Sequence, residues 1–126
     1  MSVSLPFWRD RRGTTALEFG LTAPAFFLFL FGVIEFGLLL WTQIGLQHGV
    51  EMAARCASVN SVLCTGSDAI TRYASQQALG LGLPSSTFSY SSTACGNQVN
   101  ASYAFQLPAI FGLSPLTVTA QACFPS

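Results

Sequence analysis

The feature that most constrains this chain is an apolar stretch close to its N-terminus. The sixteen residues from Phe19 to Ile34 carry no charge, and after Glu35 a further fifteen uncharged residues reach Val50. Together they exceed the ~20 residues that a helix needs to cross the hydrocarbon core of a bilayer. The stretch therefore predicts one membrane-spanning helix and leaves, in a chain of 126 residues, only one small domain to fold in water.

Charge placement predicts the orientation of this helix. Arg9, Arg11 and Arg12 precede the apolar stretch, so the positive-inside bias puts the N-terminus in the cytoplasm and the chain after about Leu46 outside. Residues 1–13 are then a short basic leader. A cleaved secretory signal peptide shows the same order, but here the apolar stretch is too long and lacks a small-x-small exit.

Helical periodicity continues beyond the apolar stretch, through Gln47, Glu51, Arg55 and Ser58. We therefore expect one helix over residues 14–58. At ~1.5 Å per residue it would be roughly 65 Å long, about twice the hydrocarbon thickness, so its distal half should stand in the periplasm as an assembly spine.

Several residues of this helix suit helix–helix packing. Pro24 removes a backbone hydrogen bond and is expected to kink the helix, which neighbouring membrane helices can compensate. Gly32 and Gly37 follow it. Gly45 and Gly49 have the small-xxx-small spacing that lets two helix backbones approach, although such glycines also occur by chance.

Residues 59–126 are expected to form a small periplasmic α+β domain. A short helix, capped by Ser67 or Asp68, should run to Gln77 or Leu79, where glycines and a proline end it. Alternating and β-prone patterns predict an antiparallel sheet of about three strands, over residues 88–92, 98–107 and 116–122. An apolar loop over residues 108–115 would join the last two strands and rest on a surface or a partner.

Four cysteines, Cys56, Cys64, Cys95 and Cys123, all follow the apolar stretch, which fits an oxidising compartment. Three disulfide connectivities are possible. We favour Cys56 with Cys64, which clamps the end of the long helix to the next loop, and Cys95 with Cys123, which closes the final hairpin. Their spacings contain no Cys-x-x-Cys knuckle, so no metal site is expected.

Composition argues against several other functions. The chain holds five basic and five acidic residues, and no cations cluster after residue 12, so a nucleic-acid partner is not expected. His48 is the single histidine and completes neither a metal triad nor a Ser-His-Asp or Cys-His arrangement. We therefore expect no enzyme activity and no cofactor, and take His48 as an interface residue.

The start of the apolar stretch resembles a type IV prepilin peptidase site, with Gly13 at the membrane edge and Glu18 five residues later. A protease at the cytoplasmic face needs a small residue before the scissile bond, and glycine lets the backbone extend into its active site. Cleavage would leave Thr14 as the new N-terminus. A carboxylate in lipid costs about 2 to 4 kcal/mol, so Glu18 needs a partner, unless it reaches back to the cytoplasmic interface.

A wider resemblance is to TadE-like pseudopilins. It rests on Arg12, Gly13, Ala16, Leu17, Glu18 and Phe19, then Pro24, then the element Phe31 to Gly37, and then Gln47, Glu51, Ala53, Ala54 and Arg55. Phe19 stands where many Tad pilins have tyrosine, and Thr14 and Thr15 replace small apolar residues. The resemblance implies that Glu18 faces the N-terminal amine of an adjacent subunit.

Glu35 belongs to the second glycine-flanked element, in the outer half of the membrane. Seventeen residues at ~100° leave it roughly 100° away from Glu18 around the helix, so the two carboxylates need separate partners. For Glu35 these are another pilin helix or waters near His48; the alternative is a protonated, solvated residue at the outer interface.

The resemblance implies a minor pilin of the bacterial inner membrane, matured by a prepilin peptidase and used in assembling a Tad (type IVc) pilus for adhesion, biofilm formation or secretion. Its partners would be that peptidase, other pilins and pseudopilins, the inner-membrane assembly platform and the lipid bilayer. About sixty residues follow the spine, which separates the chain from the major Tad pilin. The alternative is an unprocessed single-pass anchor for a periplasmic scaffold or binding protein.

Overall fold

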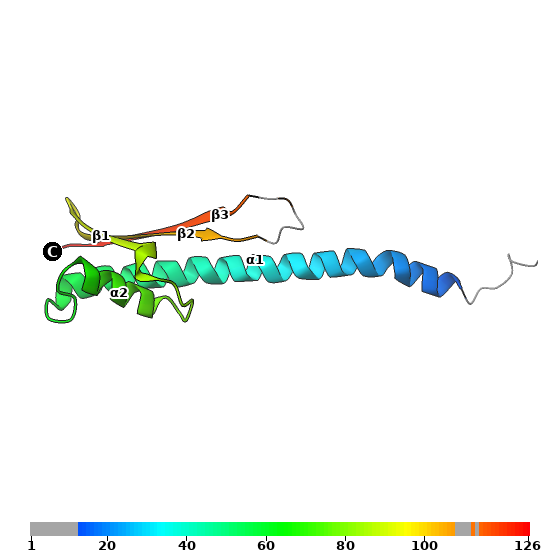
Figure 1. Cartoon of the computed structure of the whole chain (residues 1–126), viewed down its shortest axis with the longest axis horizontal. Helices are drawn as coiled ribbons and strands as arrows, with labels where there is room; N and C mark the ends of the chain where they lie inside the picture. The colour runs from blue at the N-terminus through cyan, green and yellow to red at the C-terminus, as the bar shows by residue number, and fades with distance from the viewer. Residues whose placement is uncertain (1–12, 108–111, 113) are drawn as a thin grey trace, which may run out of the picture. The chain divides into compact units, whose positions relative to one another are not determined.

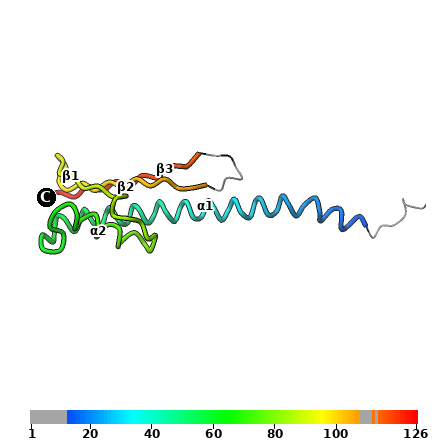
Figure 2. Tube along the Cα trace, in the orientation of Figure 1, coloured from blue at the N-terminus to red at the C-terminus, as the bar shows by residue number. Residues whose placement is uncertain are grey.

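The computed structural model describes residues 13–107, 112 and 114–126. The predicted leader up to Arg12 and most of the predicted apolar loop lie outside the described residues. The elements, in chain order, are α1 (Thr14–Val59), α2 (Ser67–Gln77), the short 3₁₀ helix η1 (Ser85–Thr87), β1 (Phe88–Thr93), β2 (Gly96–Phe105) and β3 (Leu116–Phe124) (Figures 1 and 2).

Helix α1 is continuous over 46 residues and includes Pro24. It ends one residue beyond the predicted end at Ser58. The chain divides into two compact units, one ending at Phe36 and the other comprising Gly37–Ser126, and α1 contributes to both.

In the first unit, the described residues after Gly13 are all helical, and their large apolar side chains are exposed. Among the described residues, α1 is the one helix long and apolar enough to cross a membrane. A helix that is apolar on all sides needs an apolar environment on all sides, which a bilayer or a helical bundle provides. The exposed apolar side chains are Leu17, Phe19, Leu21, Phe26, Phe27, Leu28, Phe29, Leu30, Phe31, Val33, Ile34 and Phe36.

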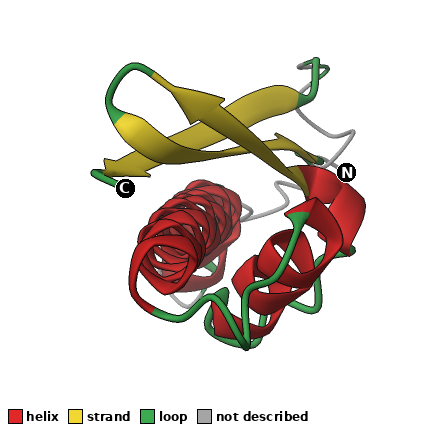
Figure 3. Ribbon diagram, turned by 90° about the vertical axis from the view of Figure 1, so that its left-hand side faces the viewer, coloured by secondary structure: helices red, strands yellow, loops and turns green. Residues whose placement is uncertain are grey.

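The second unit is built on an antiparallel sheet with strand order β1-β2-β3. Phe88 lies opposite Ala101, and Ala101 lies opposite Ala120, so these three residues form one row across the sheet. Figure 3 shows the helices on one face of the sheet and the other face uncovered. The predicted fold class, a long apolar helix followed by a disulfide-linked domain with a short helix and three antiparallel strands, is confirmed.

The core of this unit lies between the helices and the sheet. Leu46, Val50 and Ala53 of α1 follow one helical stripe and are fully buried. The strands contribute alternate residues, because side chains along a strand point to opposite faces. Burying a leucine or valine side chain stabilises a fold by about 1.5–3 kcal/mol, so this stripe fastens α1 to the sheet. The partners of the stripe are Ile70, Ala74, Ala78, Phe88, Val99, Ala101, Val118 and Ala120.

Two glutamine side chains of α1 also bond to β3, the outer strand of the sheet. The Gln43 side-chain amide donates to the carbonyl oxygen of Thr119 at 3.0 Å, and that of Gln47 donates to the carbonyl oxygen of Gln121 at 3.4 Å. These bonds occupy edge carbonyls that would otherwise be open to another strand.

The predicted cap of α2 is wrong. Gly66 precedes the helix with φ 83° and no side-chain cap, and its carbonyl oxygen accepts the N–H of Ile70 at 3.2 Å. Ser67 is the first helical residue and Asp68 lies in the first turn. Glycine suits position 66 because the backbone there is left-handed, a conformation that other residues rarely adopt. The Asp68 carboxylate lies in the first turn, where it interacts favourably with the positive end of the helix dipole.

Candidate functional site

The site begins at Gly13, which is exposed and immediately precedes α1. Its carbonyl oxygen accepts the N–H of Leu17 at 3.1 Å. A Cβ at this position would meet no atom within 4 Å, and the φ angle of Gly13 lies outside the left-handed region. Neither packing within the described chain nor backbone conformation therefore requires glycine here.

Glu18 follows in the next turn of α1 and is exposed. The Thr22 hydroxyl donates to the Glu18 backbone carbonyl at 2.9 Å and to that of Phe19 at 3.3 Å. In the part of the chain that the structure describes, the Glu18 carboxylate has no hydrogen-bond or ion-pair partner. Its neighbours Leu17 and Phe19 are 66% and 72% exposed, so a single carboxylate stands in an apolar surface.

A shallow groove of about 340 Å³ lies one turn further along the same helix. It is lined by Phe19, Thr22, Ala23, Phe26 and Phe27, a spacing that places them on neighbouring positions of the helix surface. The rings of Phe26 and Phe27 meet edge to face with centroids 5.7 Å apart. Small residues between phenylalanines leave a recess that a side chain of another helix can enter.

The residues predicted to pack helices divide into two groups. A Cβ at Gly32 or Gly37 would meet nothing within 4 Å, and Pro24 is also exposed. A Cβ at Gly45 would lie 2.5 Å from Leu81 Cδ1, and one at Gly49 would lie 2.8 Å from the carbonyl oxygen of Ala74. The structure thus uses the last two glycines inside the chain, against the end of α2 and the segment after it.

Glu35 and His48 lie in different units of the chain. Glu35 is half-buried in the first unit. The Nδ1 atom of His48 lies 2.8 Å from the carbonyl oxygen of Gln77, the last residue of α2, so His48 lies at the contact between α1 and α2. Among the described residues, no group of three or more His, Cys, Asp and Glu side chains is placed to hold a metal ion.

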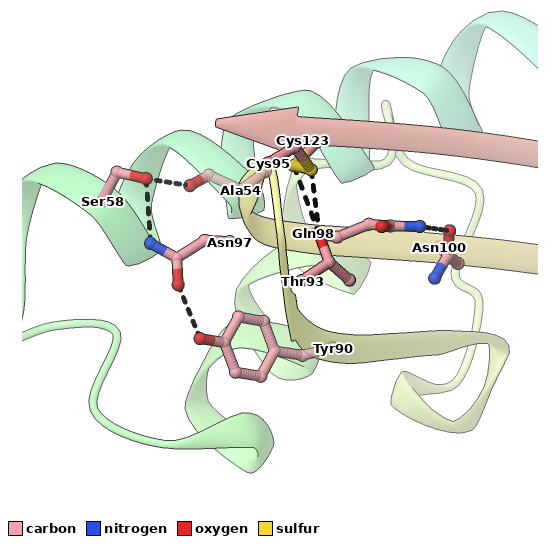
Figure 4. The surroundings of a disulfide bond; sticks show 9 residues. All are labelled: Ala54, Ser58, Tyr90, Thr93, Cys95, Asn97, Gln98, Asn100 and Cys123. Carbon is pink, nitrogen blue, oxygen red and sulfur yellow. Dashed lines mark hydrogen bonds between the residues drawn. A yellow bond between two sulfur atoms is a disulfide. The ribbon is translucent and has the colours of Figure 1, made fainter. Parts of the chain in front are cut away.

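The disulfides follow the pairing that we favoured from the sequence. Cys56 is bonded to Cys64, with Cα atoms 5.9 Å apart, and ties the end of α1 to the next loop. Cys95 is bonded to Cys123, with Cα atoms 6.4 Å apart, and joins the β1–β2 turn to the last strand (Figure 4).

A partly buried polar link beside this disulfide was missed from the sequence. The Tyr90 hydroxyl donates to Asn97 Oδ1 at 2.6 Å, and Asn97 Nδ2 donates to the Ser58 hydroxyl at 3.1 Å (Figure 4). Ser58 in turn donates to the carbonyl oxygen of Ala54 at 3.2 Å. The one sequence signal was Asn97 at an inward-facing position of a strand, where an unpaired amide would be costly.

Comparison with known proteins finds a family match over part of the chain. The family model described as TadE-like protein matches residues 13–55, which are 43 of the 126 residues. The resemblance inferred from Gly13, Glu18, Pro24 and the element Phe31 to Gly37 is thereby confirmed over this segment. No curated protein and no solved structure matches the chain. The match ends before the first cysteine, so the sheet and both disulfides lie outside it.

Proposed function

We propose that this chain, whose residues 13–55 match the TadE-like family, is a pseudopilin that takes part in assembling a Tad pilus. In this proposal a prepilin peptidase cleaves between Gly13 and Thr14, and the product acts as a minor pilin. The observation that carries the proposal is the Glu18 carboxylate, which has no partner in the described chain and stands in an exposed apolar helix.

The first step of the mechanism is storage in the inner membrane. The leader stays in the cytoplasm, the apolar half of α1 crosses the bilayer and the disulfide-linked unit folds in the periplasm. Gly13 suits the peptidase because nothing in the described chain crowds it and no side chain hinders extension of its backbone into an active site.

Cleavage then changes the charge at the start of α1. It exposes the amine of Thr14 as a cation, and the Glu18 carboxylate of a neighbouring subunit can pair with it. Apolar contacts alone select register weakly in a membrane, because lipid tails are as apolar as the helices. A charge pair in hydrocarbon is far more selective, so Glu18 would set the register while the groove between Phe19 and Phe26 receives side chains of the neighbour.

The partners in this proposal are the prepilin peptidase, other pilins and pseudopilins, the assembly platform of the inner membrane and the lipid bilayer. Gly32, Gly37, Pro24 and Glu35 would serve contacts with neighbouring helices. Gly32 and Gly37 fit this role because their positions are open in the described chain.

The deciding experiment is mass analysis of the N-terminus in cells with and without prepilin peptidase. We expect a chain that starts at Thr14 in the first strain and at Met1 in the second. A Met1 start in both strains would contradict the proposal and favour an unprocessed anchor that carries a periplasmic scaffold or binding domain.

A further inference from the structure

A second exposed apolar surface lies at the C-terminal end of α1. Val59 is 79% exposed, Val62 is 90% exposed and Leu63 is 58% exposed. They follow Gln47, Glu51 and other polar residues, so they are separate from the apolar stretch near Gly13. Contiguous exposed apolar side chains can form a contact surface, and these three lie close together along the chain.

Hydrogen bonds and a disulfide hold the loop that presents Val62 and Leu63. Asn60 Oδ1 accepts the N–H of Val62 at 3.2 Å and that of Leu63 at 3.0 Å. The N–H of Asn60 donates to the carbonyl oxygen of Cys56 at 2.8 Å, and the Cys56–Cys64 disulfide closes the loop. A surface held in one conformation loses little entropy when it binds, so this loop is preorganised for a partner.

Two shallow grooves flank the loop, of about 200 Å³ and about 170 Å³. Both are lined by Leu63 and Tyr73; the first also contains Arg55 and the second Arg72. We call this surface the distal patch, and it consists of Arg55, Val59, Val62, Leu63, Arg72 and Tyr73.

The charges around the distal patch are balanced. Glu51 precedes Arg55 by one helical turn in α1, and Asp68 precedes Arg72 by one turn in α2. These four are all the formally charged residues between Gly37 and Ser126. A purely acidic or purely basic partner would be attracted by two of them and repelled by the other two. A partner with the same alternating pattern can meet each charge with its opposite.

We propose that the distal patch binds the distal patch of a second copy of this chain. In such a two-fold contact each surface meets itself, so Val62 and Leu63 of both copies form the apolar centre. Arg55 and Arg72 of each copy then face the carboxylates of the other. The zero net charge of the second unit removes long-range repulsion between copies. This contact does not depend on cleavage at Gly13.

The first test is photocrosslinking of the full chain in vesicles of bacterial phospholipid. The photoreactive residue p-benzoyl-phenylalanine replaces Val62 in one sample and the exposed Ala104, on the uncovered face of the sheet, in a matched control. We expect a covalent dimer of this chain from position 62 and at least about fivefold less from position 104. Monomer alone from position 62, or equal yields from both positions, would overturn the proposal.

Charge reversal provides the second test, with the same crosslinker at position 62. An acidic variant combines Arg55→Glu with Arg72→Glu, and a basic variant combines Glu51→Arg with Asp68→Arg. The yield of crosslinked dimer should fall about tenfold for either variant alone. In an equal mixture of the two variants it should recover to within about twofold of the wild-type yield. An undiminished dimer in either variant, or no recovery in the mixture, would refute the pairing of charges between copies.

Folding of the variants is checked by thermal unfolding and by the mass of the intact disulfide-bonded chain. Leu63→Ser leaves every charge in place and should also lower the dimer yield at least about fivefold, because it removes the apolar centre. The N-terminal mass of the same samples reports processing independently, so loss of dimer and loss of processing are separate results.

Discussion

Gly49 of α1 packs directly against the backbone of Ala74 in α2. A Cβ at Gly49 would lie 2.8 Å from the carbonyl oxygen of Ala74 and 3.4 Å from Cε1 of Phe88. Because the nearer atom belongs to the backbone of a helix, it cannot move aside as a flexible side chain can. This contact therefore sets how closely α2 approaches α1 in the second unit.

The first prediction is that Gly49→Ala destabilises the second unit by about 1–3 kcal/mol, despite the higher helix propensity of alanine, because the methyl group overpacks the contact. Gly37→Ala is the matched control, since nothing lies within 4 Å of its Cβ position. Thermal unfolding in detergent micelles, followed by far-UV circular dichroism, should show a lower midpoint for the first variant only. Equal midpoints would contradict the close contact.

The second prediction concerns the two disulfides, which span 8 and 28 residues. From loop-closure entropy alone, replacing Cys56 and Cys64 by alanine should cost about 2.5 kcal/mol, and replacing Cys95 and Cys123 about 3.6 kcal/mol. Urea unfolding of the two double variants measures the difference. A larger loss from the shorter loop would show that packing around Cys56 and Cys64, both buried, outweighs chain entropy.

The third prediction is that Asn97→Ala costs about 1–3 kcal/mol, because it leaves the Tyr90 hydroxyl and the Ser58 hydroxyl without their shared partner. Tyr90→Phe should cost less, about 1 kcal/mol, since Asn97 keeps its bond to Ser58. Ser91→Ala is a control on the exposed face of β1. A double-mutant cycle between positions 90 and 97 should show coupling, and strictly additive losses would exclude the link.

The fourth prediction is that Gly13→Val lowers the fraction of processed chain at least about tenfold, because a branched side chain obstructs the residue before the scissile bond. The fold should be unaffected, since the position is open in the described chain. Gly20→Val, at another open glycine, is the control and should be processed normally. Mass analysis of the N-terminus gives the ratio, and normal processing of the Gly13 variant would place the cleavage site elsewhere.

The fifth prediction is that Glu18→Ala still inserts and is still cleaved, but that its incorporation into sheared pili falls at least about tenfold, because the amine of the neighbour loses its counter-charge. Leu17→Ala removes a similarly exposed side chain from the same turn and should assemble within about twofold of wild type. Immunoblots of the pilus and membrane fractions measure the ratio. Unimpaired assembly of the Glu18 variant would argue against its proposed role.

Local patterns in the sequence were enough to predict α1, α2 and the three strands, though not η1 or the cap of α2. The apolar stretch and the periodicity after it specify α1 nearly to its last residue, because a helix is held by contacts three and four positions apart. Alternation within short segments places β1, β2 and β3 in the same way. Gly13 and Glu18 lie in the segment whose resemblance to the TadE-like family was recognisable, since such a resemblance rests on a linear pattern of residues.

Tertiary structure decided which distant residues meet. Gly45 and Gly49 have the spacing of a contact between membrane helices, yet the structure packs them against Leu81 and Ala74 of the same chain. Their partner depends on where the loop after α1 returns α2, which no local pattern encodes.

The same holds for the links formed across the fold. Asn97 bonds to Ser58, which lies 39 residues earlier in the chain. Arg55 of α1 and Arg72 of α2 line neighbouring grooves, and the loop between their two helices is closed by a disulfide. Sequence periodicity determines on which face of its own helix or strand a side chain lies, because the periodicity is a property of that one element. Which other element packs against that face is determined only when loop closure and the packing of the core bring the elements together.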